Sequence, residues 1–344
     1  MLTRGSSSGF SAPLRDALFL FCLMLVSSAA FCQSDYAVES ELLAQQRVFP
    51  DAGAGFQSIA RGPAGHYYVL TAPSPTVSIY DSTGKRIGQV PANPKTKSPA
   101  AIVYGVSLDV DDAGRVVVAD AGANAVKLYA ADGSLAASFR VVQPISVALL
   151  PGGEIAVTSQ SADHLVSIYD DSGRFARAFG DPEDLSDRPD LNHLVNIGHL
   201  VRDAAANLYV AFDYFPEPTV RKYDPQGYSS LELTLKTLDF QPTAQAARRE
   251  IAREESGGVL TLHLIITGMG VDAATGDVWL SFGTLLIHFD KDGNRLDSYR
   301  TYTSAGGRLE PRTILVEPNR LLLGQDPLGI YEFARPDKKA NAGQ

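Results

Sequence analysis

The chain has 344 residues, of which 45% are hydrophobic and 20% charged, and its formal net charge is −9 at pH 7. This length and composition suit a single β domain with a large core. The acidic balance, without a run of Lys and Arg, excludes a nucleic-acid partner, because phosphate binding requires clustered cations.

Residues 1–32 predict a signal peptide. Arg4 and Arg15 supply a positive start, residues 17–26 form an apolar core of about ten residues, and residues 27–30 are small, as cleavage requires. The apolar core is too short for a permanent transmembrane helix, and no apolar run of about 18 residues follows it. The mature chain is therefore expected to lack a membrane span and to be secreted or periplasmic.

The chain contains only two cysteines, Cys22 and Cys32. After cleavage, at most one thiol remains, so no internal disulfide is expected. Cys32 leaves the alternative of a lipoprotein, but Phe31 is bulky where a lipid-modification site requires a small residue. Ordinary cleavage is favoured, and residues 33–40 (QSDYAVES) are expected to form a flexible lead-in.

One sequence unit recurs through most of the remaining chain. Its clearest copy, residues 105–139, contains four runs rich in β-branched and aromatic residues, separated by the turn signals DDAG, AGAN and ADG. Five copies place an aromatic residue four positions before a glycine. These residues are Tyr80 and Gly84, Tyr129 and Gly133, Tyr169 and Gly173, Tyr223 and Gly227, and Phe289 and Gly293. We expect the aromatics to pack between sheets and the glycines to adopt the positive φ of a hairpin turn.

An earlier turn precedes the second strand of each copy. It ends at Gly65, Gly114, Gly153, Asn207 and Gly276, and a fainter sixth copy covers residues 313–333. Repeats this short cannot bury their own faces, and four strands per repeat favour a propeller over a solenoid. The predicted fold class is all-β: a six-bladed β-propeller of four-stranded antiparallel blades over residues 41–335, with one short inserted helix.

A small turn, a strand ending in VAD and an aromatic-D-x-x-G hairpin together resemble the NHL-repeat type of six-bladed β-propeller. The resemblance covers roughly residues 50–335 and is clearest at residues 116–133, where Asp120 and Asn124 occupy the family's positions. Only Asp213 repeats this aspartate in another copy. We interpret Asp120 as a carboxylate that caps a turn by accepting backbone N–H bonds.

The two ends of the repeat region predict how the ring closes. Residues 41–50 (ELLAQQRVFP) form a predicted strand before the first copy, whereas the sixth copy ends after its third strand. Because closure removes open sheet edges, a strand near residues 41–49 is expected to pair beside residues 328–335. Residues 336–344 are expected to be a disordered tail.

Two insertions lengthen neighbouring copies. Residues 180–196 are acidic and contain prolines, and residues 240–258 contain a predicted helix near residues 243–256, with Thr243 as its N-cap and glycines after its end. The acidic segment lacks the ligand spacing of a calcium loop, so a solvated loop is favoured. Both insertions are expected to rim the same sector of the ring.

The candidate ligand-binding residues lie within or beside these insertions. They are Asn192, His193, Asn196, His199 and His263. Histidine changes its charge near neutral pH and is the commonest metal ligand, but the spacing here is not that of a zinc site. Structural or surface roles are favoured for each residue. No cofactor is predicted and no metal is expected. A divalent metal in the central channel remains the alternative, with His199 and His263 as its candidate ligands.

The function predicted from these features is that of an exported binding or interaction module. Its partner is expected to be a protein, a peptide or a small ligand that binds loops at one mouth of the channel, and the chain is expected to be monomeric. The alternative is a metal-dependent lyase or lactonase on the same fold. The enzyme is disfavoured because the first strands are mostly apolar or small, and no G-x-S-x-G elbow occurs. No catalytic residue is predicted.

Overall fold

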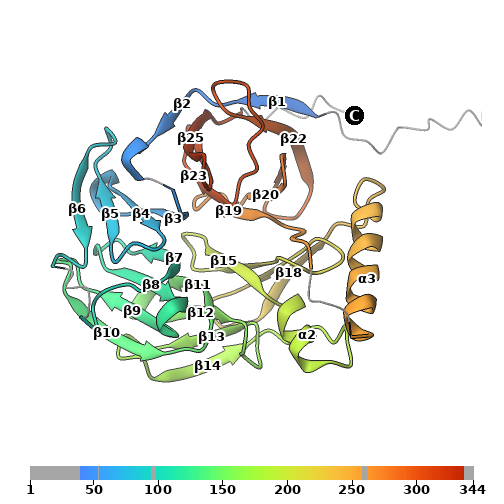
Figure 1. Ribbon diagram of the computed structural model, residues 1–344, viewed down its shortest axis with the longest axis horizontal. Helices are drawn as coiled ribbons and strands as arrows, with labels where there is room; N and C mark the ends of the chain where they lie inside the picture. The colour runs from blue at the N-terminus through green and yellow to red at the C-terminus, as the bar shows by residue number, and fades with distance from the viewer. Residues whose placement is uncertain (1–38, 53, 94–97, 258–261, 337–344) are drawn as a thin grey trace, which may run out of the picture. The chain divides into compact units, whose positions relative to one another are not determined.

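The computed structural model describes residues 39–336, apart from residues 53, 94–97 and 258–261. Within them, six β-sheets follow one another around a ring, and each sheet is one blade (Figure 1). The predicted fold class, an all-β propeller of six four-stranded antiparallel blades, is confirmed. The predicted signal peptide at residues 1–32, most of the lead-in and nearly all of the tail lie outside the described residues.

Each blade begins with a strand near the centre of the ring and adds strands outward (Figure 1). Blades 1 to 3 contain β3 (Phe56–Arg61), β4 (Tyr67–Thr71), β5 (Val77–Tyr80) and β6 (Arg86–Val90); β7 (Gly105–Val110), β8 (Val116–Asp120), β9 (Ala125–Tyr129) and β10 (Leu135–Arg140); and β11 (Pro144–Leu149), β12 (Ile155–Ser159), β13 (Val166–Tyr169) and β14 (Phe175–Phe179). Blades 4 to 6 contain β15 (Gly198–Arg202), β16 (Leu208–Phe212), β17 (Thr219–Tyr223) and β18 (Ser229–Thr234); β19 (Gly268–Val271), β20 (Val278–Phe282), β21 (Leu285–Phe289) and β22 (Arg295–Tyr302); and β23 (Thr313–Val316), β24 (Arg320–Gln325) and β25 (Gly329–Ala334).

The repeated aromatic and glycine residues behave as predicted. The aromatics Tyr80, Tyr129, Tyr223 and Phe289 are buried, and Tyr169 is half-buried. All five hairpin glycines have positive φ, between 78° and 94°. A Cβ on Gly173 would also lie 2.5 Å from Phe139, in the last strand of the preceding blade. Glycine is therefore required here both by the turn and by the packing between blades.

The earlier turn of the fourth copy corrects the predicted alignment. Asp203 Oδ1 accepts backbone N–H bonds from Ala205 and Asn207, and Ala206 between them has a φ of 63°. The residue that replaces glycine in this turn is therefore Ala206, rather than Asn207. The aspartate that holds both N–H groups supports the strained backbone.

Two strands from the N-terminal segment close the ring. β2 (Gln46–Val48) pairs antiparallel with β25, with Gln46 opposite Glu332, so the predicted closure of the sixth blade is confirmed. A further strand was not predicted: β1 (Ser40–Leu43) begins at the last residue of the expected lead-in and pairs in parallel with β22 of blade 5. The N-terminal segment thus joins blades 5 and 6 and covers the outer edge of each.

The insertions contain two helices, whereas the sequence predicted one. The predicted helix is α3 (Gln241–Glu255), but its N-cap is Phe240 instead of Thr243, because Pro242 is tolerated in the first turn. The acidic segment forms a second helix, α2 (Pro189–Val195). The two helices are neighbours, as expected: Leu191 and Val195 pack with Ile251 of α3. Among the residues with described positions, no helix is long and apolar enough to cross a membrane.

Two glycines in β19 allow the inner strands of blades 5 and 6 to approach closely. A Cβ on Gly268 would lie 2.9 Å from the backbone of Arg312, and a Cβ on Gly270 would lie 2.6 Å from Ile314 Cγ2 and 2.7 Å from Ile314 O. Backbone atoms cannot move aside as the end of a side chain can. The start of blade 6 is therefore held closely against β19.

We expect Gly270→Ala to lower the free energy of unfolding by about 1–3 kcal/mol, because the new methyl group would force the two strands apart. Gly88→Ala is the matched control, since a Cβ there would meet Ile79 at an ordinary distance of 3.6 Å. Urea denaturation of both variants tests the prediction. A loss at Gly270 no greater than the loss at Gly88 would show that the close approach is not required.

Candidate functional site

The aspartate shared with the NHL pattern has a structural role. Asp120 is fully buried and accepts backbone N–H bonds from Val103 (3.0 Å), Tyr104 (2.9 Å) and Ala123 (3.2 Å). Oδ2 of Asp120 also accepts a hydrogen bond from the buried Lys127, whose Nζ lies 2.7 Å away. The interpretation of Asp120 as a turn-capping carboxylate is confirmed, and the residue also neutralises a buried lysine.

Two of the predicted ligand-binding residues hold the acidic insertion together. Asn192 Oδ1 accepts N–H bonds from Leu185 and Ser186, and its Nδ2 donates to Asp184. Asn196 bonds both the N–H and the C=O of Glu183, at 2.8 Å each. Both amides are occupied by the fold of their own segment, so neither is available to anchor a ligand.

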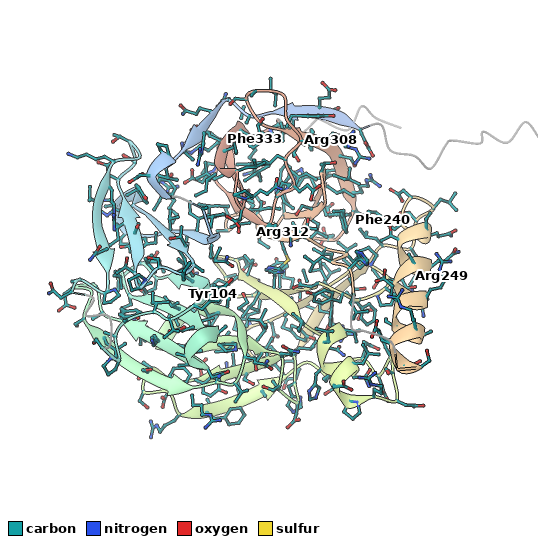
Figure 2. All side chains as sticks on the ribbon, viewed as in Figure 1. Tyr104, Phe240, Arg249, Arg308, Arg312 and Phe333 are labelled. Carbon is teal, nitrogen blue, oxygen red and sulfur yellow. The ribbon has the colours of Figure 1, made fainter. Side chains whose placement is uncertain are left out.

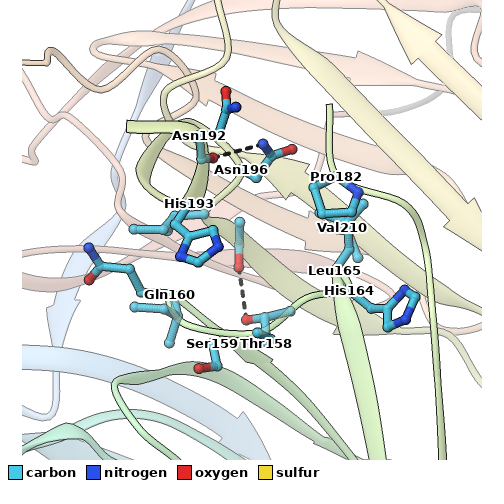
Figure 3. A pocket seen from close by; sticks show the side chains of 14 residues that line it. Thr158, Ser159, Gln160, His164, Leu165, Pro182, Asn192, His193, Asn196 and Val210 are labelled. Carbon is cyan, nitrogen blue, oxygen red and sulfur yellow. Dashed lines mark hydrogen bonds between the residues drawn. The ribbon is translucent and has the colours of Figure 1, made fainter. Parts of the chain in front are cut away.

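His193 lines a groove between blades 3 and 4 (Figure 3). The groove also contains Ser159, Gln160 and His164, and its floor is fixed by the bond from Thr158 Oγ1 to the carbonyl oxygen of Gly198. Its cavity volume is about 40 Å³. A space of that size holds roughly three water molecules, so it is too small for an organic ligand.

The two histidines proposed as metal ligands do not share a site. His263 is 78% exposed, and its Nδ1 lies 2.6 Å from Glu250 of α3. His199 instead pairs with Asp213. Over the part of the chain that the structure describes, no three His, Cys, Asp or Glu side chains are placed to hold a metal. The convergence that would favour the metal enzyme is therefore not found among these residues.

His199 is the second residue of inner strand β15, and its imidazole is held by a buried carboxylate. Nδ1 lies 2.6 Å from Asp213 Oδ1. Asp213 is fixed through its main chain, because its N–H donates to Ile197 and its C=O accepts from Ile265. The imidazole itself is 39% exposed. This arrangement fixes the ring by one nitrogen and leaves the imidazole partly exposed.

The charges around His199 set its protonation. The pKa of His199 is raised above its ordinary value, mainly by the negative charge of Asp213 and also by the hydrogen bond to Asp213. Burial and the positive charge of Arg312 lower it, but by less. Burial raises the pKa of the neighbouring Tyr214, with a further contribution from the charge of Asp213, while the charge of Arg312 again lowers it. Arg312 therefore lies close enough to act on both side chains.

Arg312 immediately precedes inner strand β23, and it is placed at the centre of the ring in Figure 2. Its backbone N–H donates to Gly324, and its side chain is exposed. Its guanidinium makes no hydrogen bond or ion pair with any residue that the structure describes. His199, Asp213, Tyr214 and Arg312 together form what we call the axial cluster. It combines a fixed imidazole with an exposed arginine that no described residue pairs with.

At the opposite ends of the inner strands, an arginine is already paired with a carboxylate. Arg202, at the far end of β15, lies 2.9 Å from Asp109 of blade 2 and also donates to the C=O of Val110. The charge of Asp109 raises the pKa of Arg202. This pair ties blade 2 to blade 4, so its guanidinium is already used by the fold.

The sequence indicated His199 but not the rest of the axial cluster as a site. Asp213 was noted only as a repeat of the NHL aspartate, and Tyr214 directly follows it. Arg312 lies just before the faintest copy of the repeat. The available signal was its position: residues immediately before the first strands of all blades meet at one end of the ring's axis.

We expect Asp213→Asn to lower the pKa of His199 and Arg312→Gln to raise it, because each change removes the charge responsible for the opposite effect. Arg308→Gln is the control, since Arg308 is an exposed arginine of the same connection that lies away from the centre in Figure 2. NMR titration of the His199 ring protons measures all three. Equal pKa values in the wild type and in both axial variants would contradict the arrangement of charges.

Comparisons with known proteins define the fold but no family. No family model matches the chain, and no curated protein matches it in sequence. Among solved structures, it is similar to a streptogramin B lyase, with 14% identity, a TM-score of 0.52 and 89% of each chain covered. The chain is a six-bladed β-propeller.

Two further structures have the same fold. A catalytically inactive variant of virginiamycin B lyase from Staphylococcus aureus with quinupristin is 13% identical, with a TM-score of 0.51 over 87% of this chain and 90% of that one. Regucalcin from Agrobacterium tumefaciens, described as a calcium-binding protein, is 12% identical, with a TM-score of 0.53 over 86% and 95% of the two chains. At these identities the likeness concerns the fold alone.

Proposed function

We propose that this chain is an exported propeller that binds a small ligand at the axial cluster. The observation that carries the proposal is Arg312: its exposed guanidinium lies at the ring's axis beside the His199–Asp213 pair and has no partner among the described residues. A rigid ring of blades holds these groups in place, so binding requires little ordering of the protein.

Three other places in the described part of the molecule support a ligand less well. The groove beside His193 is too small, the amides of Asn192 and Asn196 are occupied, and at the far end of β15 the guanidinium of Arg202 is already paired with Asp109. Of the residues chosen from the sequence, His199 is the one that the proposal retains as a ligand-binding residue.

The proposal also covers the repeat family and the location of the chain. We assign the chain to the NHL-repeat type on its aromatic–glycine repeats, and we retain the signal peptide at residues 1–32, on its positive start and apolar core. Secretion or a periplasmic location follows from that segment, and a lipoprotein at Cys32 is the alternative. We further propose that the chain acts as a monomer.

A lyase is the second candidate, and one observation favours it. A partly exposed imidazole held through Nδ1 by a buried carboxylate is the arrangement of a general base or acid. Two structures with the same fold are described as lyases. Regucalcin is described as calcium-binding, so a metal stays part of this candidate, although the described residues do not provide a three-ligand group.

Ligand-detected NMR with a set of small aromatic compounds tests the binding proposal. The set contains neutral, anionic and cationic members, and it is measured against the wild type, Arg312→Gln and the control Arg308→Gln. We expect at least one charge class to bind the wild type and the control but not the axial variant. The same compounds binding all three proteins equally, or no compound binding at all, would refute a ligand site at the axis.

The lyase candidate is tested by incubating the protein with quinupristin and following the compound by mass spectrometry. The incubation is done with and without an added divalent metal. A lyase would consume quinupristin, and His199→Gln would abolish this conversion. A protein that binds compounds at the axis but leaves quinupristin unchanged would behave as a binding module towards this compound.

A further inference from the structure

The charges at the axis are not balanced within the described part of the protein. Asp213 Oδ1 is committed to His199, and no further carboxylate is paired with Arg312 among those residues. With His199 protonated, the axial cluster carries two positive charges and one negative charge. This positive site lies in a chain whose formal net charge is −9. An anion would therefore be attracted to the axis and repelled by most of the remaining surface.

Comparison with other arginines shows why Arg312 is a candidate binding group. Arg221 lies within ion-pair distance of Glu183 and Glu232, and Arg320 pairs with Glu317 and Glu332. In these cases the planar fork of the guanidinium is filled by carboxylates of the same chain. Arg312 presents the same fork to solvent at the axis. One such fork matches the two oxygens of a carboxylate.

Apolar side chains lie at the same end of the inner strands. Tyr104 and Val103 immediately precede inner strand β7, as Arg312 precedes β23, and they are 44% and 57% exposed. Tyr104 lies near the centre of the ring in Figure 2. Large apolar groups exposed beside a polar anchor are typical of sites for organic molecules. A ligand with an aromatic or aliphatic body could contact them while its charged end reaches Arg312.

We propose that the ligand of the axial cluster is a small organic carboxylate, bound through Arg312, and that its affinity falls when His199 loses its proton. This inference rests on the proposed function. It adds the chemical class of the ligand and a dependence on pH that follows from the position of His199 beside Arg312.

The groups that face His199 determine the sign of this dependence. The charged groups are Asp213 of blade 4 and Arg312 of blade 6, and the neighbouring Tyr214 stays neutral because burial raises its pKa. The flanking inner strands β11 and β19 contribute no ionisable side chain, and Tyr209 of β16 faces Asp203 instead. The pKa of His199 is raised above the ordinary histidine value of about 6.5, so the imidazole stays positively charged up to a higher pH. Anion binding is therefore strongest at low pH and weakens as pH rises through that raised pKa.

Calorimetric titration of the full mature chain tests the inference with three probes of one shape: benzoate, benzamide and benzylamine. At about pH 6, we expect benzoate to bind at least roughly tenfold more tightly than either of the other probes, which is the magnitude of a charged hydrogen-bonded pair. Arg312→Gln should weaken benzoate by a similar factor, and Arg308→Gln should leave it unchanged. Between about pH 6 and pH 9, benzoate affinity should fall around the pKa of His199 measured by NMR, and His199→Gln should lose this fall.

Reciprocity supplies a second readout: saturating benzoate should raise the pKa of His199 in the wild type. Equal affinity for benzoate and benzamide, or an Arg312→Gln variant that binds benzoate as the control does, would overturn the inference. If benzamide binds at the axis and benzoate does not, the carboxylate proposal fails while the proposed function stands. If none of the probes binds, the carboxylate proposal fails as well.

Discussion

Replacing Asp120 with asparagine is expected to lower the free energy of unfolding by about 3–5 kcal/mol, because it would leave the positive charge of Lys127 buried without its counter-ion. Lys127 is 4% exposed, and besides Asp120 its Nζ reaches the carbonyl oxygen of Ala101 at 2.5 Å. The single oxygen of asparagine can still accept from Tyr104 and Ala123, but its NH2 group would face the N–H of Val103 as well as Lys127. The loss therefore reports on the unpaired lysine together with one lost backbone bond.

Two further variants separate the buried charge from the turn. The double variant Asp120→Asn with Lys127→Met should recover part of the lost stability, since no charge then remains in the core, although the N–H of Val103 still lacks its acceptor. Asp132→Asn in the same blade is the matched control: Asp132 serves an exposed hairpin turn through Ser134, and its replacement should have a much smaller effect. Chemical denaturation gives all three values. Equal losses in the single and double variants would contradict the role assigned to Lys127.

Removing the closing strands is expected to abolish cooperative folding. A chain that begins at residue 49 lacks β1 and β2, so blade 6 would keep three strands and β25 would become an open edge. Val48 would also leave the cluster that contains Leu322 and Ile330. A propeller that is not closed exposes both a row of unpaired backbone groups and the face of a blade, which favours aggregation.

The matched comparison is a chain that begins at residue 39 and retains both strands. It should unfold in one cooperative thermal transition and elute as a monomer, whereas the chain from residue 49 should aggregate or unfold without a transition. A chain from residue 45 keeps β2 and lacks β1, and it should be folded but less stable. Cooperative folding of the chain from residue 49 would show that closure by β2 is dispensable.

The blades could be predicted because their signals are local. Tyr129 and Gly133 lie within one hairpin, and the φ that the turn requires depends on the chain alone. α2 could not be predicted, because its seven residues gain their stability from contacts with Ile251 of α3. The parallel pairing of Ser40 with Tyr299 likewise joins segments that are distant in sequence, and no local pattern indicates it.

The candidate site was predicted in part for the same reason. His199 was found because histidine has distinctive chemistry, but Arg312 comes from another blade and joins it only when the ring closes. Asn192 and Asn196 were chosen for their position in an insertion, and their side chains bond the backbone of that insertion. The sequence thus indicated polar residues in and beside the insertions, but it does not distinguish those whose side chains bond the fold from those that remain exposed.

A crystal structure of the chain from residue 39 onward, soaked in benzoate, tests the central claim, that the axial cluster is the ligand site, most directly. We predict benzoate at the ring's axis, with its carboxylate within hydrogen-bond distance of Arg312 and next to His199. The account is contradicted if well-diffracting crystals with an open axis contain no benzoate there, or if benzoate occupies only other places, such as the groove beside His193.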